Sequence, residues 1–504
     1  MGGVQLACSP GHTRRGWASS AVRPLIVLRD PTSEPALNRL LPLMLVACGG
    51  TCQPGDTGSP TDSLETSPAD TQDSDQGVDD APVSDVSWWV NETIGSVVHV
   101  SWQQEVSATA WLEFSTDGET WQRSPQLVRE VGEHEALILG VPYGSTFTFR
   151  VASDQGEGTV YAEDQSASND PLPEEAPVPA LTTADQSGWA ESDRWLLIGM
   201  SNEGENWEAE AFWKLILNRD GEVVWAHETP GGYRSFYMQP SRDGSHIIWD
   251  ETTFWTDFDK GAGSQVHRMT LDGAILESIA LPGLHHTFID LGEGHLVWGG
   301  VEEREEVIRE RDADGDVRPV WNCDAFWTAH GASRGCDGNA MFFNEPDNTL
   351  LFSSDNDNTV VELDRETGEV LRYFGQLDGA WAFSEGSNAF WKQHSPTYTE
   401  EGNLLLSTWA AENRQEVVAR EYALDEENQQ LVEVWSCGEG TGDIGRYAGE
   451  AHRLAGGNTL LNYGDGGIIR EYTPGCEVVW HLVWPGGPLL GRAMFLDDLY
   501  DYAP

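Results

Sequence analysis

Histidines recur at one place in a repeated phrase in the second half of this 504-residue sequence. The phrase is a histidine, a polar turn and a hydrophobic run, as in residues 392–397 followed by 402–407. The histidines of these phrases are His285 and His286, then His330, His394 and His452. A neutral imidazole can attack an electrophilic centre, and it can carry a proton near neutral pH. Histidines in equivalent positions of a repeat meet around one axis if the repeats close into a ring.

The segments that must position these histidines resemble short strands joined by tight turns. Six phrases place a turn between two apolar runs, at residues 219–225, 271–276, 314–321, 364–371, 425–435 and 474–480. Asp-Gly turns between alternating apolar runs are typical of hairpins. Self-similarity of this kind predicts a β-propeller, whereas a flat sandwich does not suit six repeats. We predict an all-β protein in which residues 187–504 form a six-bladed propeller with the histidines at one mouth of its channel.

Residues 86–183 alternate with a period of two and contain turn signals such as Asp117-Gly118. Short antiparallel strands over about a hundred residues are typical of a β-sandwich. The segment resembles a fibronectin type III domain, because Trp102 stands where that fold has an early core tryptophan and residues 143–151 resemble its late strand. We therefore expect a fibronectin type III-like β-sandwich ahead of the propeller.

The chain before residue 86 resembles a lipoprotein signal followed by a tether. Residues 1–48 end in a short apolar run and Leu45-Val46-Ala47-Cys48, which resembles a bacterial lipobox. The run is too short to span a bilayer, and a buried cysteine is the alternative for Cys48. The resemblance implies translation from near Leu37, export, and membrane attachment only through lipid on Cys48, at the outer membrane or cell surface. Residues 49–85 are acidic and rich in Ser, Thr and Pro, which predicts a disordered tether.

The composition excludes one class of partner and predicts disulfides. The net charge is −54 and the pI is about 4.3, so binding to the phosphate backbone of nucleic acid is not expected. In an exported protein, nearby cysteines pair as disulfides, whereas free thiols are the alternative. The sequence contains no Cys-x-x-Cys pair of the kind that indicates a zinc site. We expect neither a metal nor a cofactor. The expected disulfides are Cys323–Cys336 and Cys437–Cys476.

The region 187–504 resembles the bacterial arylsulfate sulfotransferases, which are six-bladed propeller enzymes that do not use PAPS. The matching phrases are residues 284–288, 348–354 leading into 359–369, 393–394 with 402–406, and 457–462, of which the run 353–369 is the most specific. The resemblance implies transfer of a sulfuryl group from a phenolic sulfate to a phenolic acceptor through a sulfohistidine. The alternative is an inactive propeller that binds ligands or glycans at the cell surface.

The resemblance also implies roles for individual residues. His394 matches the nucleophile, and His330 and His285 match supporting catalytic histidines, although His286 is an alternative for His285. We expect His286, Arg334 and Trp391 to bind substrate. The aromatic residues Trp327, Phe390 and Trp391 flank the histidines and either line an aromatic slot or pack in the core. Positive or hydrogen-bonding groups would stabilise the sulfuryl oxygens as charge moves to the leaving phenolate.

One position departs from the family pattern. The family carries an arginine directly after the Ser-Ser phrase, and here that position is Asp355. A carboxylate repels an anionic sulfate group, so Asp355 favours the binding alternative, and Arg334 is a candidate substitute for the missing arginine. The run of Asp355, Asn356 and Asp357 has oxygen ligands that suit calcium, but a polar turn is the more frequent role of such a run.

Overall fold

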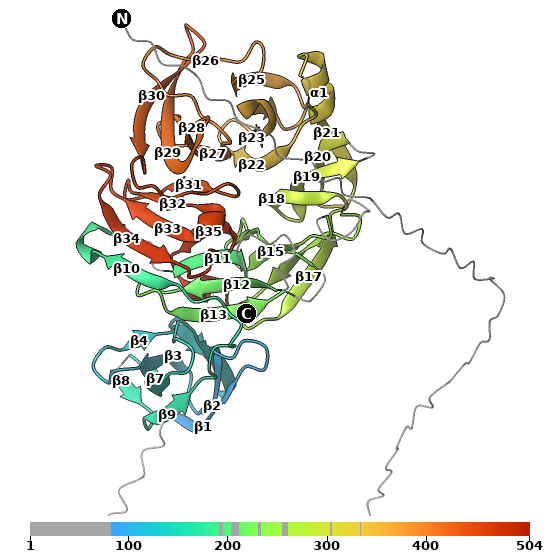
Figure 1. The fold of residues 1–504 in the computed structure, drawn as a ribbon. Helices are drawn as coiled ribbons and strands as arrows, with labels where there is room; N and C mark the ends of the chain where they lie inside the picture. The colour runs from blue at the N-terminus through green and yellow to red at the C-terminus, as the bar shows by residue number, and fades with distance from the viewer. Residues whose placement is uncertain are drawn as a thin grey trace, which may run out of the picture. The chain divides into compact units, whose positions relative to one another are not determined.

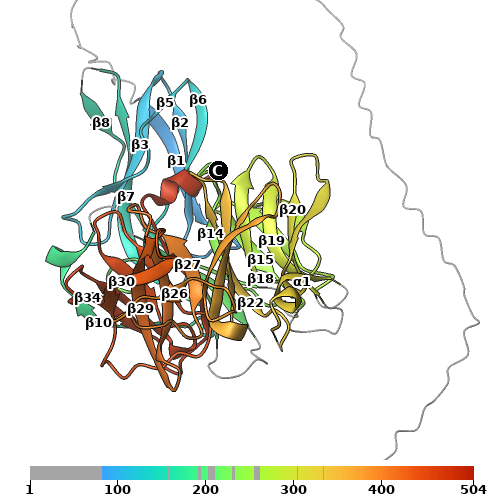
Figure 2. The same ribbon diagram turned by 90° about the horizontal axis from the view of Figure 1, so that it is seen from above.

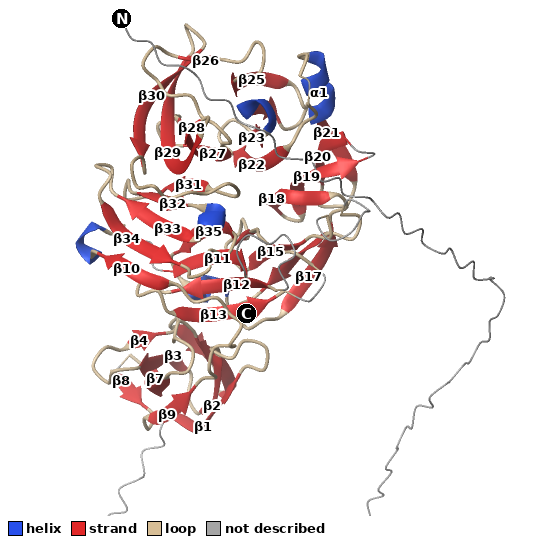
Figure 3. Ribbon diagram, in the orientation of Figure 1, coloured by secondary structure: helices blue, strands red, loops and turns tan. Residues whose placement is uncertain are grey.

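The structure is a computed structural model that describes residues 82–156, 158–190, 195–202, 211–229, 233–254, 261–302, 305–332 and 334–504. The predicted signal region with Cys48, and the predicted tether up to residue 81, lie outside the described residues. Within the described residues, no helix has both the length and the apolar character needed to cross a bilayer. Strands dominate, as Figures 1 and 3 show. The all-β prediction is confirmed for these residues.

Two antiparallel sheets form the N-terminal part. Their strands are β1 (Val83–Val90), β2 (Val98–Gln104) and β6 (Gly132–Ile138) in one sheet, and β3 (Ala108–Ser115), β4 (Gln122–Arg123), β5 (Leu127–Arg129), β7 (Thr146–Asp154), β8 (Thr159–Tyr161) and β9 (Gln165–Ser168) in the other. Apolar side chains from both sheets share one core, in which Trp102 is 1% exposed. Strand β1 begins at Val83, three residues before residue 86, where the sandwich was predicted to begin.

The described residues between Ala180 and Leu496 form six further sheets of four or five strands. The first three contain β35 (Leu490–Leu496), β11 (Trp195–Ser201), β12 (Phe212–Leu217) and β13 (Val223–Glu228); β14 (Met238–Pro240), β15 (Ile247–Glu251), β16 (Gln265–Met269) and β17 (Ile275–Ala280); and β18 (Leu284–Gly292), β19 (His295–Glu302), β20 (Glu305–Arg311) and β21 (Val317–Asn322). The helix α1 (Cys323–Ala329) separates β21 from the next sheet.

The remaining three sheets follow in the same pattern. They contain β22 (Gly338–Asn344), β23 (Thr349–Ser354), β24 (Thr359–Asp364) and β25 (Val370–Gly375); β27 (His394–Tyr398), β28 (Leu404–Ala411), β29 (Arg414–Asp425) and β30 (Gln430–Cys437), with β26 (Ala382–Phe383) parallel to β30; and β31 (Glu450–Arg453), β32 (Thr459–Asn462), β33 (Ile468–Tyr472), β34 (Val478–Val483) and β10 (Ala180–Ala184). Short 3₁₀ turns are η1 (Gln186–Gly188), η2 (Asn356–Asn358), η3 (Gly464–Gly466) and η4 (Leu499–Tyr502).

Strands β14, β18, β22, β27, β31 and β35 are called the inner strands here, because they contact one another. Contacts join β14 to β35, β18 to β22, β22 to β27, β27 to β31 and β31 to β35. The view in Figure 2 shows the sheets from another side. Each of the six predicted turn phrases joins the third and fourth strands of its sheet, for example between β12 and β13. The hairpin predictions are therefore confirmed.

The two ends of the six-sheet region are paired into its last and first sheets. Strand β10 pairs with β34, and β35 pairs with β11. The predicted boundary between the domains, with the sandwich ending at residue 183, is therefore wrong. Residues Ala180–Ala184 alternate in the same way as sandwich strands do, but their hydrogen-bonding partner is the C-terminal strand β34. The alternation alone does not reveal which neighbour a strand pairs with.

The N-terminal sheets share a hydrophobic core with the six-sheet region. Ile94 and Leu139 pack in one buried cluster with Trp225, Met269 and Leu496. Hydrogen bonds support this contact, since the Asn91 amide donates to the carbonyl of Asp272 at 2.9 Å. The sandwich is therefore attached by a packed interface and not only by the chain that follows it.

Both expected disulfides are present, which confirms the pairing. The Cα atoms are 5.7 Å apart in Cys323–Cys336 and 5.5 Å apart in Cys437–Cys476. The first ties the start of α1 to the chain that enters β22, and the second ties the end of β30 to the turn between β33 and β34. Each disulfide therefore fixes a connection at the rim of a sheet.

We predict that Leu139→Ala lowers the free energy of unfolding by about 2–5 kcal/mol, because it opens a cavity in the shared core. Leu139 is 3% exposed in that core. Chemical denaturation followed by tryptophan fluorescence measures the change. The matched control is Leu127→Ala, because Leu127 is 46% exposed, and it should change stability by no more than about 0.5 kcal/mol. Equal effects of the two substitutions would contradict a stabilising core that is shared by the sandwich and the six-sheet region.

Candidate functional site

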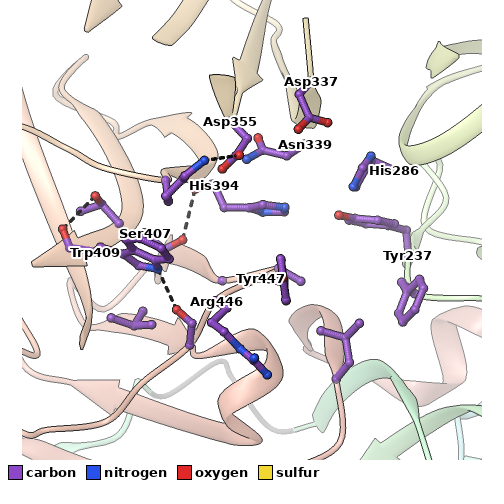
Figure 4. A pocket seen from close by; sticks show the side chains of 18 of the residues that line it. Tyr237, His286, Asp337, Asn339, Asp355, His394, Ser407, Trp409, Arg446 and Tyr447 are labelled. Carbon is purple, nitrogen blue, oxygen red and sulfur yellow. Dashed lines mark hydrogen bonds and ion pairs between the residues drawn. The ribbon is translucent and has the colours of Figure 1, made fainter. Parts of the chain in front are cut away.

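A cavity of about 280 Å³ opens beside the inner strands. Its walls come from segments far apart in the sequence. The lining residues are Phe236, Tyr237, His285, His286, Asp337, Asn339, Asp355, Lys392, His394, Ser407, Thr408, Trp409, Val417, Gly445, Arg446, Tyr447, Ala448, Gly449 and Leu489. Figure 4 shows the imidazole of His394 pointing across this cavity toward His286 and Tyr237. The cavity therefore brings His394 together with the His285-His286 pair, as the repeat predicted.

His394 stands at the start of β27, behind a tightly fixed turn. Lys392 and Ser395 have left-handed backbone angles, with φ of 51° and 48°. Such angles cost a non-glycine residue about 1–3 kcal/mol, and they cluster at functional sites. The fully buried Gln393 holds the turn, because its side-chain Nε2 donates to the Ser354 carbonyl at 2.8 Å and its backbone carbonyl accepts from Asn339 Nδ2 at 2.8 Å. The surrounding structure thus fixes the direction of the His394 side chain.

A chain of hydrogen bonds sets the tautomer of His394. Its Nδ1 lies 3.2 Å from Ser395 Oγ, and that hydroxyl donates to Glu450 Oε1 at 3.1 Å. Because the Ser395 proton goes to Glu450, its oxygen is left to accept a hydrogen bond from N–H of His394 Nδ1. Nε2 then carries the lone pair. This is the form of histidine that can act as a nucleophile.

Burial and neighbouring charges shift the pKa values of His394 and Glu450, the two ends of this hydrogen-bonded chain. Burial lowers the pKa of His394 to about 4, although Glu450 and Asp355 act to raise it. Burial acts to raise the pKa of Glu450, but the hydrogen bond and charge of His452, the charge of Arg492 and the Ala493 N–H lower it to about 2. At neutral pH, therefore, a neutral imidazole lies next to an ionised carboxylate in a buried setting.

His286 and Tyr237 form the opposite wall. Burial, followed by the charges of His285 and His394, lowers the pKa of His286 well below its ordinary value, so this ring is also neutral at pH 7. His285 Nε2 lies 3.1 Å from Glu306 Oε1, which orients the first ring of the pair. Burial raises the pKa of the Tyr237 hydroxyl, which keeps it a hydrogen-bond donor. The wall offers a neutral base and a neutral donor.

The remaining polar groups bring charge of both signs. Lys392 Nζ forms an ion pair with Asp355, drawn as a dashed line in Figure 4. Burial and the neighbouring carboxylates Asp355 and Glu306 raise the pKa of Asp337. Arg446 Nε pairs with Asp465 at 2.9 Å. Each of these two cations in the lining therefore has a carboxylate partner that it would have to share with an anionic ligand.

The apolar walls suit a planar ring. Phe236, Trp409, Tyr447, Val417 and Leu489 contribute aromatic and aliphatic surface to the cavity. Trp409 is held in place because its Nε1 donates to the Gly445 carbonyl at 2.8 Å. Offset and edge-to-face contacts of such side chains favour an aromatic ligand.

Not all of the predicted site residues reach this cavity. The prediction that His330 lines it with His394 is wrong, because α1 carries His330 at its C-terminus, where Nδ1 lies 2.8 Å from the Phe326 carbonyl. The ring packs on Phe326, with centroids 4.1 Å apart. Arg334 and Trp391 line a neighbouring cavity instead. Of the other flanking aromatic residues, Trp327 and Phe390 are fully buried in the core.

Strand register explains why His452 is also absent from the lining. His394 pairs with Ser407, the last residue of the run 404–407, whereas Asn462, the last residue of the matching run 459–462, pairs with Glu450. Glu450 therefore occupies the place of His394 in its sheet. His452 comes two residues later, and its Nε2 lies 3.3 Å from Glu450 Oε2. The repeated phrase aligns His452 with His394 in the sequence, but the two residues pair at different positions in their sheets.

Sequence reasoning missed several residues of the site. Tyr237, Asn339 and Lys392 line the cavity and Glu450 accepts from Ser395, and only these three-dimensional contacts single the four residues out. Lys392 and Glu450 carried one available signal, because each lies within a few residues of a repeated histidine. Among the described residues, no group of three or more His, Cys, Asp or Glu side chains is placed to hold a metal ion. Asp355 pairs with Lys392, and residues 356–358 form the turn η2, so the polar-turn interpretation fits this run.

Comparisons with known proteins show no family for this chain. No protein-family model and no curated protein matches it. Among solved structures, a protein of unknown function from Bacteroides caccae has 17% identity and a TM-score of 0.40, over 59% of this chain and 99% of that chain. A streptogramin B lyase has 12% identity and a TM-score of 0.36, over 60% and 87%. The β-propeller domain of Cps50 (Swd1) from Myceliophteria thermophila has 12% identity and a TM-score of 0.33, over 64% and 87%.

We predict that His394 makes the protein more stable at pH 7 than at pH 4.5. Its folded pKa of about 4 lies below the ordinary histidine value of 6.5, so the unfolded chain binds more protons between these values. Stability from this source is complete above pH 6.5 and is lost as the pH falls toward 4. The free energy of unfolding of the unmodified protein minus that of His394→Gln should be greater at pH 7 than at pH 4.5, by roughly 2 kcal/mol. Urea unfolding at both pH values measures the difference, and no difference would contradict a buried neutral His394.

Proposed function

We propose that this chain transfers a sulfuryl group from a phenolic sulfate ester to a phenolic acceptor, with His394 as the nucleophile. The observation that carries the proposal is the chain from His394 Nδ1 through Ser395 to Glu450, which leaves Nε2 as a nucleophile beside a cavity with aromatic walls. The resemblance of residues 353–369, and of 393–394 with 402–406, to the arylsulfate sulfotransferases supports the same chemistry. No cofactor is needed for this reaction.

In the first step, Nε2 of His394 attacks the sulfur, and the bond from sulfur to the phenolic oxygen breaks. The electron pair of that bond leaves on the phenolate, and His394 becomes a positively charged N-sulfo-imidazolium. Glu450 is ionised and 1% exposed, so its charge stabilises this cation through Ser395. A hydrogen bond from the Tyr237 hydroxyl or from Lys392 stabilises the departing oxygen.

In the second step, the oxygen of the acceptor phenol attacks the sulfur. The bond from sulfur to Nε2 breaks, and its electron pair returns to the His394 imidazole. His286 faces His394 across the cavity, and we assign it to take the proton of the acceptor on the ground of this position. The covalent route replaces one difficult displacement with two easier ones.

The same proposal assigns an architecture to the chain. We propose that the six sheets between Ala180 and Leu496 are the six blades of one propeller, and the contacts that join the inner strands of neighbouring sheets support this. We propose that the sandwich is a fibronectin type III domain, and the grouping of β1, β2 and β6 in one sheet with β3, β7 and their partners in the other supports this. We also propose an exported lipoprotein anchored at Cys48, which agrees with the two disulfides, since these are typical of oxidising compartments.

A second candidate function is ligand binding without transfer. Two carboxylates, Asp337 and Asp355, line the cavity, and Asp355 neutralises Lys392. A site built for a sulfate group would leave this cation available to the anion. This candidate predicts that phenols bind but that no sulfuryl group moves.

The reaction is tested with 4-nitrophenyl sulfate as donor and phenol as acceptor. We expect acceptor-dependent release of nitrophenolate that falls at least about 10³-fold in His394→Ala, because the nucleophile is lost. The matched control is His330→Ala, which should keep most of the activity because His330 lies outside the cavity. Intact mass spectrometry of the protein with donor alone should show one sulfuryl adduct, absent in His394→Ala. If the folded protein releases no nitrophenolate and forms no adduct, the transferase proposal is wrong, and ligand binding without transfer is the supported function.

We predict that Asp355→Asn lowers the KM for the sulfate donor roughly fivefold or more, because it removes a like charge and releases Lys392 toward the anion. Lys392→Met should have the opposite effect. Initial rates across a series of donor concentrations measure both. An unchanged KM in both variants would show that the sulfate group binds elsewhere in the cavity.

A further inference from the structure

A second cavity of about 300 Å³ adjoins the first. The two cavities share Asp355, Lys392 and Trp409, so these three side chains line both spaces. The residues found only in the second cavity are Arg334, Asn356, Asp357, Asn358, Gln376, Trp391 and Glu412. This lining differs in kind from that of the first cavity, because it combines indole rings with amides and carboxylates.

The two tryptophans are fixed next to each other by backbone contacts. The Trp409 N–H donates to the Trp391 carbonyl at 2.9 Å, and the Trp391 N–H donates to Thr408 Oγ1 at 2.7 Å. Both side chains are partly exposed. A partly exposed indole face that the backbone holds in place is available to stack on a ligand.

The polar side of the second cavity is also built into the fold. Asn358 Oδ1 accepts from the Lys392 N–H at 2.8 Å, and its Nδ2 donates to Gln376 Oε1 at 3.3 Å. Asp357 and Asn358 hold left-handed backbone angles, with φ of 60° and 44°. The turn η2 therefore presents amide and carboxylate groups beside the turn that carries His394.

The charges of the second cavity disfavour a second anion. Its carboxylates are Asp355, Asp357 and Glu412, and its cations are Arg334 and Lys392. With more carboxylates than cations, the cavity offers no positive excess. Carboxylates accept hydrogen bonds from neighbouring hydroxyls, amides both accept and donate them, and an indole face packs against C–H groups. This combination recognises a neutral ring that carries several hydroxyl groups.

We propose that the second cavity binds the sugar of a phenolic glycoside, while the phenol ring of the same molecule lies in the first cavity next to His394. This deepens the proposed function, on which it rests for the phenol-binding role of the first cavity. Trp391 stacks on the sugar, and Asp357 and Asn358 bind its hydroxyl groups. The substrates are thus glycosylated phenols and not only small free phenols.

The test compares arbutin, which is hydroquinone carrying one β-glucose, with hydroquinone itself. Isothermal titration calorimetry on the full chain should show at least about tenfold tighter binding of arbutin, since one stacked ring and its hydrogen bonds are added. Trp391→Ala should remove this preference and leave the affinity for hydroquinone unchanged. The matched control Trp435→Ala should keep the preference, because Trp435 lines neither cavity. Equal affinities for the two compounds, or a preference that survives in Trp391→Ala, would overturn the inference.

This binding experiment separates the inference from the proposed function, because it requires no transfer. A glucose preference that depends on Trp391, together with inactivity toward 4-nitrophenyl sulfate, would support the sugar site and overturn the transferase. Transfer without such a preference would support the transferase and overturn the sugar site. Trp391→Phe keeps an aromatic face, so partial retention of the preference in a folded variant would support stacking.

Discussion

The buried carboxylate of Glu450 is the interaction on which the site depends. It accepts hydrogen bonds from the Ser395 hydroxyl of β27 and from the Ala493 N–H of β35, and it belongs to β31 itself. One negative charge therefore ties three inner strands together and orients His394. A buried charge is tolerated only when it is fully bonded, and Arg492 and His452 complete its partners. Glu450 therefore both joins the inner strands and orients His394, so a substitution at this position changes the strand contacts and the site together.

Several features of the molecule are readable from the sequence because they are local. Turns such as Asp220-Gly221 and Asp272-Gly273 require particular backbone angles, and they locate the hairpins correctly. The cysteine pairs are close along the chain, and they too are correct. His394 and the His285-His286 pair meet in one cavity because each begins an inner strand of its sheet.

Other features depend on partners that the sequence does not reveal. His330, the histidine of the second phrase, stands at the end of the inserted helix α1 and so lies outside the cavity, and His452 stands two residues out of register with His394. The role of Glu450 follows from strand pairing, and that of Lys392 from its contact with Asp355. Alternation identified Ala180–Ala184 as a strand but assigned it to the wrong domain, since its partner β34 lies some three hundred residues further on.

The pairing of β10 with β34 and of β11 with β35 also governs when the protein can become complete. The first sheet lacks its inner strand, and the last sheet its outer strand, until residues from opposite ends of the region meet. Contacts between such distant segments form late, because the entropy of closing a long loop is lost before these contacts can stabilise the fold. A nascent chain thus carries open sheet edges until almost its last residues emerge, and such edges are prone to association with other chains. A chaperone that holds the growing polypeptide would act in that interval.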